Sequence, residues 1–126
     1  MLTIRREQLE VLSAYMRQSF EDRMVRHLAQ SFPTQFKKLA SGSDEPVRLL
    51  IRQGVDRAAG YQITSERDVG RFIEVMVAVH PQFETMQEMN WARQILGEKV
   101  LTSRARMDLI YQRLRDEHPS LEPEPR

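Results

Sequence analysis

The sequence predicts an all-α fold: a compact single-domain bundle of five or six helices around a buried central helix at about residues 65–80. Three observations favour this fold class. Apolar residues recur at three- and four-residue spacing, prolines and glycines separate these stretches, and the stretch at 65–80 is apolar over most of its circumference. A helix with so little polar surface belongs in the interior, so we expect the other helices to cover it.

The central helix is predicted from its two ends and its spacing. Ser65, followed three residues later by Asp68, is typical of a capping box, and we expect Thr64, Ser65 and Asp68 to form the structural cap. Pro81 is expected to end the helix. The β-branched run at residues 75–79 would also suit a buried strand, but the period and the length favour a helix. The apolar stripe consists of Val69, Phe72, Ile73 and Met76 and ends at His80.

Shorter signals place the other elements. The remaining helices are predicted at residues 3–32, 34–40, 44–60 and 88–96, and from Thr102 or Ser103 onward. Gly54 interrupts the apolar face of the helix at 44–60, where glycine costs about 1 kcal/mol relative to alanine. We therefore expect another helix to approach closely at Gly54. One helical domain should span residues 1–118, and the proline-rich, charged tail at 119–126 should be disordered.

Composition narrows the function classes. The 126 residues suffice for one domain that is stable without cross-links, and the absence of cysteine excludes disulfides. Nineteen basic and eighteen acidic residues leave a net charge of +1, so the protein as a whole does not attract nucleic acid or anionic lipid strongly. Neither a signal peptide nor a membrane-spanning stretch is visible. We expect a cytoplasmic protein that binds neither nucleic acid nor membrane.

The sequence offers no set of catalytic, metal-binding or other cofactor-binding residues. His27, His80 and His118 each lack a second ligand at metal-binding spacing, and structural histidines are the better interpretation. No serine lies in a Gly-x-Ser-x-Gly context, and the five glycines form no phosphate-binding loop. We therefore expect no cofactor and no enzymatic activity.

A DNA-binding helix-turn-helix is a weaker alternative. The helices at 44–60 and 65–80 flank Gly60, as such a motif would require. The connection is longer than usual, however, and Arg67 and Arg71 alternate with acidic residues that would repel phosphates.

Protein binding is the function class that the residues favour. The irregular segment after Pro81 contains methionines and aromatic residues, a combination typical of adaptable binding surfaces. The alternative is a lid that closes the core, since apolar residues in such a segment are usually buried. The hypothetical partner-binding patch consists of Phe83, Met86, Met89 and Trp91. The sequence does not indicate whether the chain self-associates.

Two runs resemble a known group of proteins. Residues 61–69, Tyr-Gln-Ile-Thr-Ser-Glu-Arg-Asp-Val, and 91–96, Trp-Ala-Arg-Gln-Ile-Leu, are similar to signatures of small helical bacterial proteins encoded beside spike, PAAR and effector genes of type VI secretion systems. The run at residues 4–9 extends this resemblance over most of the chain. It implies an adaptor or co-chaperone for effector loading, with a secreted effector, a spike component or a chaperone as partner. An immunity protein against a cognate toxin is the alternative, and no catalytic residue is implied.

Overall fold

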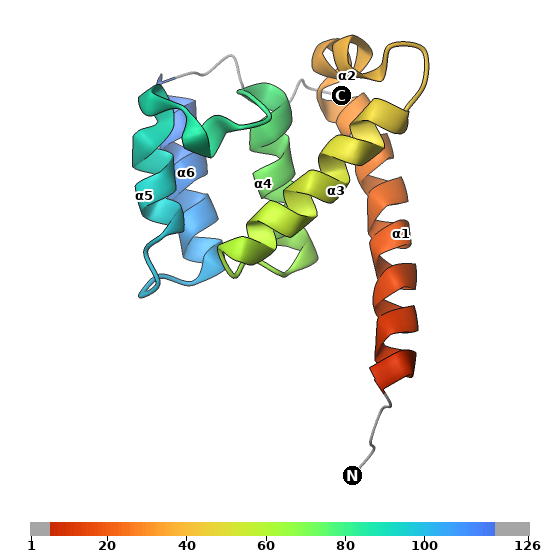
Figure 1. Cartoon of the computed structure of the whole chain (residues 1–126). Coiled ribbons are helices and arrows are strands. Elements are labelled where there is room, and N and C mark those ends of the chain that lie inside the picture. Colours follow the sequence, from red (N-terminus) through yellow and green to blue (C-terminus); the bar gives the residue numbers. More distant parts are fainter. Residues whose placement is uncertain (1–5, 118–126) are drawn as a thin grey trace.

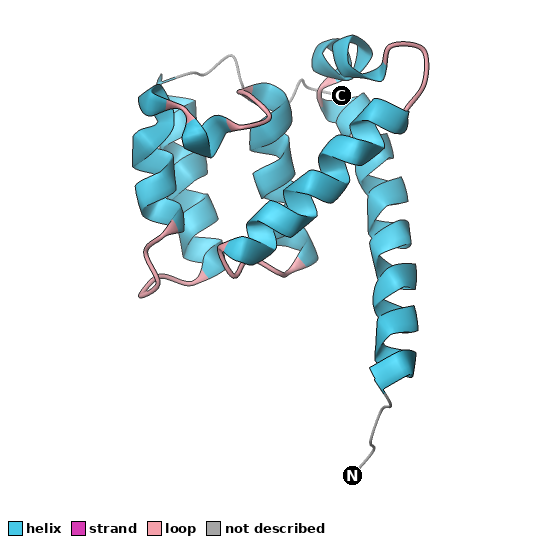
Figure 2. Ribbon diagram, viewed as in Figure 1, coloured by secondary structure: helices cyan, strands magenta, loops and turns pink. Residues whose placement is uncertain are grey.

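Six α-helices and two short 3₁₀ turns make up residues 6–117, the part of the chain that the computed structural model describes, with side chains from residue 14 onward. No strand occurs within these residues (Figure 2), so the all-α prediction is confirmed and residues 75–78 are helical. The expected helix start at Thr3, His118 and the tail at 119–126 lie outside the described residues. In chain order the elements are α1 (Arg6–Ser31), α2 (Pro33–Ala40), α3 (Glu45–Gly60), α4 (Glu66–Ala78), η1 (Phe83–Thr85), η2 (Gln87–Met89), α5 (Asn90–Leu96) and α6 (Ser103–Glu117).

The helix α4 lies at the centre of the bundle (Figure 1). It contacts α1, α2 and α3 on one side and α6 on the other, and α5 packs on the outside of α6. Eight of its thirteen residues are buried, which leaves only a narrow polar edge. The central position predicted from the apolar stripe is therefore confirmed.

The start of α4 is fixed by a side-chain cap that also reaches α6. Ser65 is the N-cap residue, and its hydroxyl oxygen accepts a hydrogen bond from the backbone N–H of Asp68 at 3.3 Å. The same hydroxyl donates to Asp68 Oδ2 at 2.9 Å, and the Ser103 hydroxyl donates to that oxygen at 3.0 Å. Thr64, which we expected to share in the cap, lies one residue before it and is exposed. The helix ends at Ala78, earlier than the predicted residue 80.

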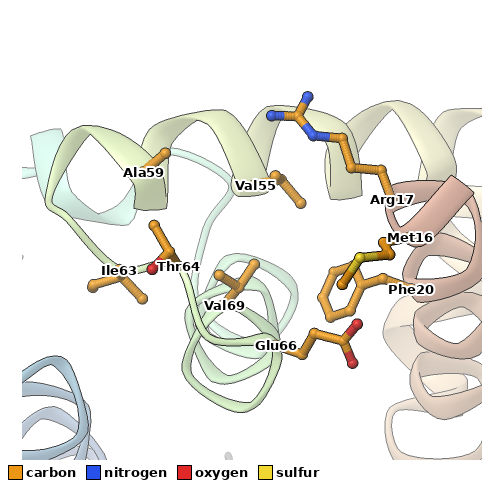
Figure 3. A pocket seen from close by; sticks show the side chains of 9 residues that line it. All are labelled: Met16, Arg17, Phe20, Val55, Ala59, Ile63, Thr64, Glu66 and Val69. Carbon is orange, nitrogen blue, oxygen red and sulfur yellow. The ribbon is translucent and has the colours of Figure 1, made fainter. Parts of the chain in front are cut away.

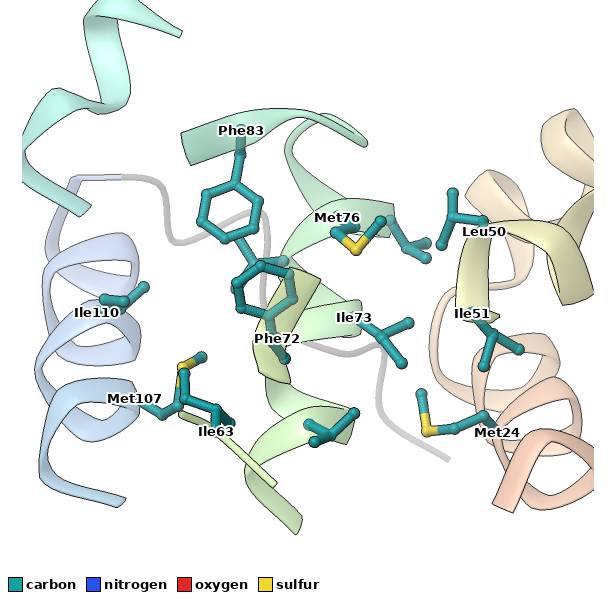
Figure 4. Packing of buried hydrophobic residues seen from close by; sticks show 14 of the residues in the cluster. Met24, Leu50, Ile51, Ile63, Phe72, Ile73, Met76, Phe83, Met107 and Ile110 are labelled. Atoms are coloured by element: carbon teal, nitrogen blue, oxygen red, sulfur yellow. The ribbon is translucent and has the colours of Figure 1, made fainter. Parts of the chain in front are cut away.

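The closest approach in the core is between α3 and α4 at Gly54. A β-carbon added at Gly54 would lie 2.6 Å from Ile73 Cγ1 and 2.9 Å from Met76 Sδ, distances that real side chains do not tolerate. On the α3 side of α4, Ile73 and Met76 face Leu50 and Ile51 of α3 (Figure 4). The expected close helix approach at Gly54 is thus confirmed.

Replacing Gly54 should test this crossing. We expect Gly54→Ala to lower the free energy of unfolding by about 1–3 kcal/mol, because the added methyl group overpacks the core by more than helix propensity recovers. Urea unfolding followed by far-UV circular dichroism measures the change. Gly60→Ala is the matched control, since a β-carbon at the last residue of α3 meets no atom within 4 Å and stability should be equal or slightly raised. Equal stability of Gly54→Ala and the parent would contradict the crossing.

Candidate functional site

The four residues of the hypothetical partner-binding patch, within residues 83–91, pack against the core, as the lid alternative expects, and this segment is called the lid below; that these residues bind a partner stays a prediction. Phe83 and Met89 are buried, whereas Met86 and Trp91 are half-buried against the same core. Phe83 points at Phe72 of α4, with ring centroids 5.1 Å apart (Figure 4). The physical reason is that an exposed Phe72 ring would be unfavourable in water. The segment with the two 3₁₀ turns shields this ring from solvent.

Buried charge fastens this lid to α3. Arg57 of α3 donates from Nε to Glu84 Oε1 at 2.8 Å, and its guanidinium also donates to the backbone carbonyl of Pro81. Glu84 is buried, and the Arg57 guanidinium lies 5.7 Å from the centre of the Phe72 ring. Because one arginine holds two points of the segment, the lid is a fixed part of the core.

An apolar groove between α1, α3 and the start of α4 is the candidate site that the sequence did not indicate (Figure 3). It encloses about 240 Å³, and Met16 and Phe20 reach from α1 toward Val55 of α3 and Val69 of α4. Charged side chains occur only at its edges, where Arg17 and Glu66 lie. The full lining is Met16, Arg17, Phe20, Val55, Ala59, Ile63, Thr64, Glu66 and Val69.

The groove opens where α1 leaves the body of the protein. Residues 14–18 are all exposed, and burial begins only at Phe20. Five successive helical residues span more than one full turn, so no other described element covers α1 there. Tyr15 is 74% exposed and Met16 is 57% exposed, which is unusual for large apolar side chains on one helix. The exposed residues 14–18 of α1 are called the arm below; Figure 1 shows the N-terminal part of α1 extending past α3.

Ion pairs hold the C-terminal half of α1 on α3. Glu21 is only 5% exposed, and its two oxygens accept hydrogen bonds from Arg48 Nη1, Arg52 Nε and Arg52 Nη2, each at 3.0 Å. Burial alone would raise the pKa of the Glu21 carboxyl, but the hydrogen bonds and charges of Arg52 and Arg48 outweigh it and hold this pKa below its ordinary value.

Two further pairs hold α1 on α4. Arg23 donates to both oxygens of Glu66, at 2.9 and 3.0 Å, directly beside the groove. One turn later, His27 Nε2 lies 2.8 Å from Glu74 Oε1. The other oxygen of Glu74 accepts from the Tyr111 hydroxyl of α6 at 2.6 Å; burial, and then this carboxylate, raise the pKa of Tyr111. These contacts fix the direction in which the arm leaves.

The remaining histidine within the described range has a local partner. His80 Nδ1 accepts a hydrogen bond from the backbone N–H of Gln82 at 3.0 Å, at the turn that leads into the lid. Among the side chains of residues 14–117, no three or more metal-ligating groups meet at one point. The geometry therefore gives no starting point for a metal centre within that range.

Comparison of the chain with known proteins identifies no similar protein. No protein-family model matches the chain, and neither a curated protein nor a solved structure matches it significantly. None of the helices within the described range combines the length and the apolar character needed to cross a bilayer. The functional argument therefore rests on the geometry of the groove and the arm.

Truncating one lid residue should separate a core role from a surface role. We expect Met89→Ala to lower the free energy of unfolding by about 2–5 kcal/mol, since it leaves a cavity beneath the lid. Met16→Ala removes the same side chain from an exposed position and should change stability by less than about 0.5 kcal/mol. Thermal or urea unfolding of both variants measures the difference. A Met89→Ala variant as stable as Met16→Ala would restore the surface interpretation.

The buried carboxylate of Glu21 should make stability depend on pH. Its pKa is lower in the folded than in the unfolded protein, so its contribution is full above about pH 4.3 and is lost as the pH falls through the folded value. We expect Glu21→Gln to reduce stability at neutral pH by about 1–3 kcal/mol and to weaken the further loss toward pH 3. Urea titrations at several pH values measure both effects. Glu98→Gln, on an exposed loop, should leave the pH profile unchanged; an identical profile in Glu21→Gln would refute this role.

Proposed function

We propose that this protein is a non-enzymatic accessory protein that binds another protein, as an adaptor or co-chaperone for loading a type VI secretion effector. The observation that carries this proposal is the apolar groove that continues onto the exposed residues 14–18 of α1. Apolar side chains gathered in a groove and on an unsupported helix are typical of interaction surfaces.

The shape of this surface suits a helical segment of the partner. One wall is α1, the other is formed by α3 and the start of α4, and the floor is apolar with charges at the edges (Figure 3). This arrangement resembles grooves that accept the apolar face of an amphipathic helix. Short helical stretches without packing partners are only marginally stable in water, so an added helix would also stabilise residues 14–18.

The resemblance to proteins encoded beside type VI secretion genes supports the secretion role. Four residues of its first signature, at 61–69, line the groove: Ile63, Thr64, Glu66 and Val69. None of these four side chains caps α4, because Ser65 and Asp68 make the cap. The second signature, at 91–96, coincides almost completely with α5, which packs against the lid.

The two alternatives differ in what supports them. An immunity protein could use the same groove, and it would protect cells that express the cognate toxin. A helix-turn-helix regulator receives no support from the fold, since α4 would be its recognition helix and is buried over most of its surface.

Co-purification with the products of neighbouring genes tests the proposal. We expect one neighbour to co-purify with the parent protein and Met16→Glu to reduce the complex at least tenfold, because the charge enters the apolar groove at an already exposed position. Val100→Glu is the matched control: Val100 is 90% exposed, does not line the groove, and should leave the complex intact. The proposal fails if no neighbour binds, or if both variants bind equally well.

A further inference from the structure

We propose that Met16 is a site of reversible oxidation, at which a peroxide converts the thioether to a sulfoxide and so makes the groove a poorer site for an apolar segment. The oxidation itself depends neither on the secretion role nor on any partner, whereas its effect on docking rests on the proposed function. Three observations support the site: the exposure of Met16, the burial of the other methionines within residues 14–117, and the position of Met16 in the groove.

Met16 differs in exposure from the other methionines of residues 14–117. It is 57% exposed, whereas four of the others are buried and the fifth is half-buried against the core: Met24, Met76, Met89, Met107 and Met86, in that order. A dissolved oxidant must touch the sulfur atom, so exposed thioethers react before buried ones. The chain has no cysteine, so no thiol of the same molecule competes for the oxidant. Within this range a peroxide therefore reaches Met16 first.

The reaction needs an oxidant of the peroxide class and a thiol reductant to reverse it. Hydrogen peroxide transfers one oxygen atom to Met16 Sδ: a sulfur lone pair forms the S–O bond, the O–O bond breaks, and water leaves. Sulfur thereby loses two electrons, which the peroxide gains. In the reverse reaction, catalysed by methionine sulfoxide reductases, two thiols supply two electrons and become a disulfide, and the oxygen leaves as water. Because Met16 is exposed, a reductase can reach it as well.

The position of Met16 determines what the added oxygen does. Met16 lines the groove together with Phe20, one turn later on α1, and both reach toward Val55 and Val69 (Figure 3). These three neighbours have no side-chain hydrogen-bond donor, and a sulfoxide oxygen is a polar acceptor. An apolar segment seated over Met16 would bury this oxygen without a partner, which disfavours docking.

Oxidation at Met16 differs from oxidation in the core in its effect on the fold. In the free protein the new oxygen faces water, so the folded state should be as stable as before. Met24, two turns later on the same helix, is buried, and its Sδ would lie 3.4 Å from a β-carbon at Gly70. An added oxygen there would disrupt the packing of α1 on α4. Met16 is therefore the position where oxidation changes the surface and spares the core.

Peptide mapping of the peroxide-treated full-length protein tests the site. Trypsin cleaves after Arg6 and Arg17, so Met16 is released in a peptide that contains no other methionine. We expect its sulfoxide to form at least about tenfold faster than that of Met89, with an unchanged urea midpoint while Met16 alone is modified. The two methionine sulfoxide reductases, one for each epimer, should together remove the oxygen. Equal oxidation rates at Met16 and Met89, or a sulfoxide that the reductases leave in place, would overturn the site.

Binding of the co-purifying neighbour, measured before and after peroxide treatment, tests the effect on docking. The parent should bind about tenfold more weakly after oxidation and recover after treatment with the reductases. Met16→Leu has no thioether at this position, so its own affinity should be the same before and after treatment. Equal affinity of the parent in both states, or an equal loss in Met16→Leu, overturns the effect on docking. If no neighbour binds either protein, the proposed function fails, and the peptide map still decides whether Met16 is an oxidation site.

Discussion

The close crossing of α3 over α4 at Gly54 is the contact on which the rest of the structure depends. Because Gly54 has no side chain, Ile73 and Met76 fill the space between the two helices, and eight residues of α4 are buried. The neighbours of Gly54 on α3 then reach the groove and the lid. Val55 forms a wall of the groove, and Arg57, three residues after Gly54, holds the lid. A larger separation of α3 and α4 would therefore displace both the groove and the lid.

Buried charges in this protein connect elements of the fold. A charged side chain in the interior is a common sign of an active site, because burial and specific partners shift its pKa. Here each such residue joins two elements instead. Glu21 links α1 to α3, Glu84 links the lid to α3, and Asp68 links the start of α4 to α6. Arg106 of α6 is equally buried and donates to the backbone carbonyls of Tyr61 and Leu96, which fixes the ends of α3 and α5. Such pairs favour one arrangement of the helices, because removing either partner leaves an unpaired buried charge.

The features that the sequence predicted are those set by local chemistry. The cap at Ser65 and the apolar period of α4 depend on residues within one or two helical turns of each other. The close approach at Gly54 was visible because a glycine stands where the apolar face of α3 would otherwise have a larger side chain. The sequence indicated the lid only as an alternative to an interface, and it did not indicate the groove. Met16 and Phe20 belong to one stripe in the sequence, yet one is exposed and the other buried, because α1 leaves the body between them. Likewise, Phe83 is covered only because Phe72 lies opposite it. Both outcomes depend on the directions of helices that are distant in sequence.

The exposed side chains beside the groove limit what can bind there. Large apolar side chains that are exposed on a helix favour non-specific association, and within residues 14–18 these side chains are Tyr15 and Met16. Met16 also lines the groove, so a segment seated in the groove would cover it. Arg17 and Glu66 lie at the groove edges, where they would oppose an apolar segment that lacks complementary charges. The apolar floor therefore favours binding, and the charged edges restrict which segments bind.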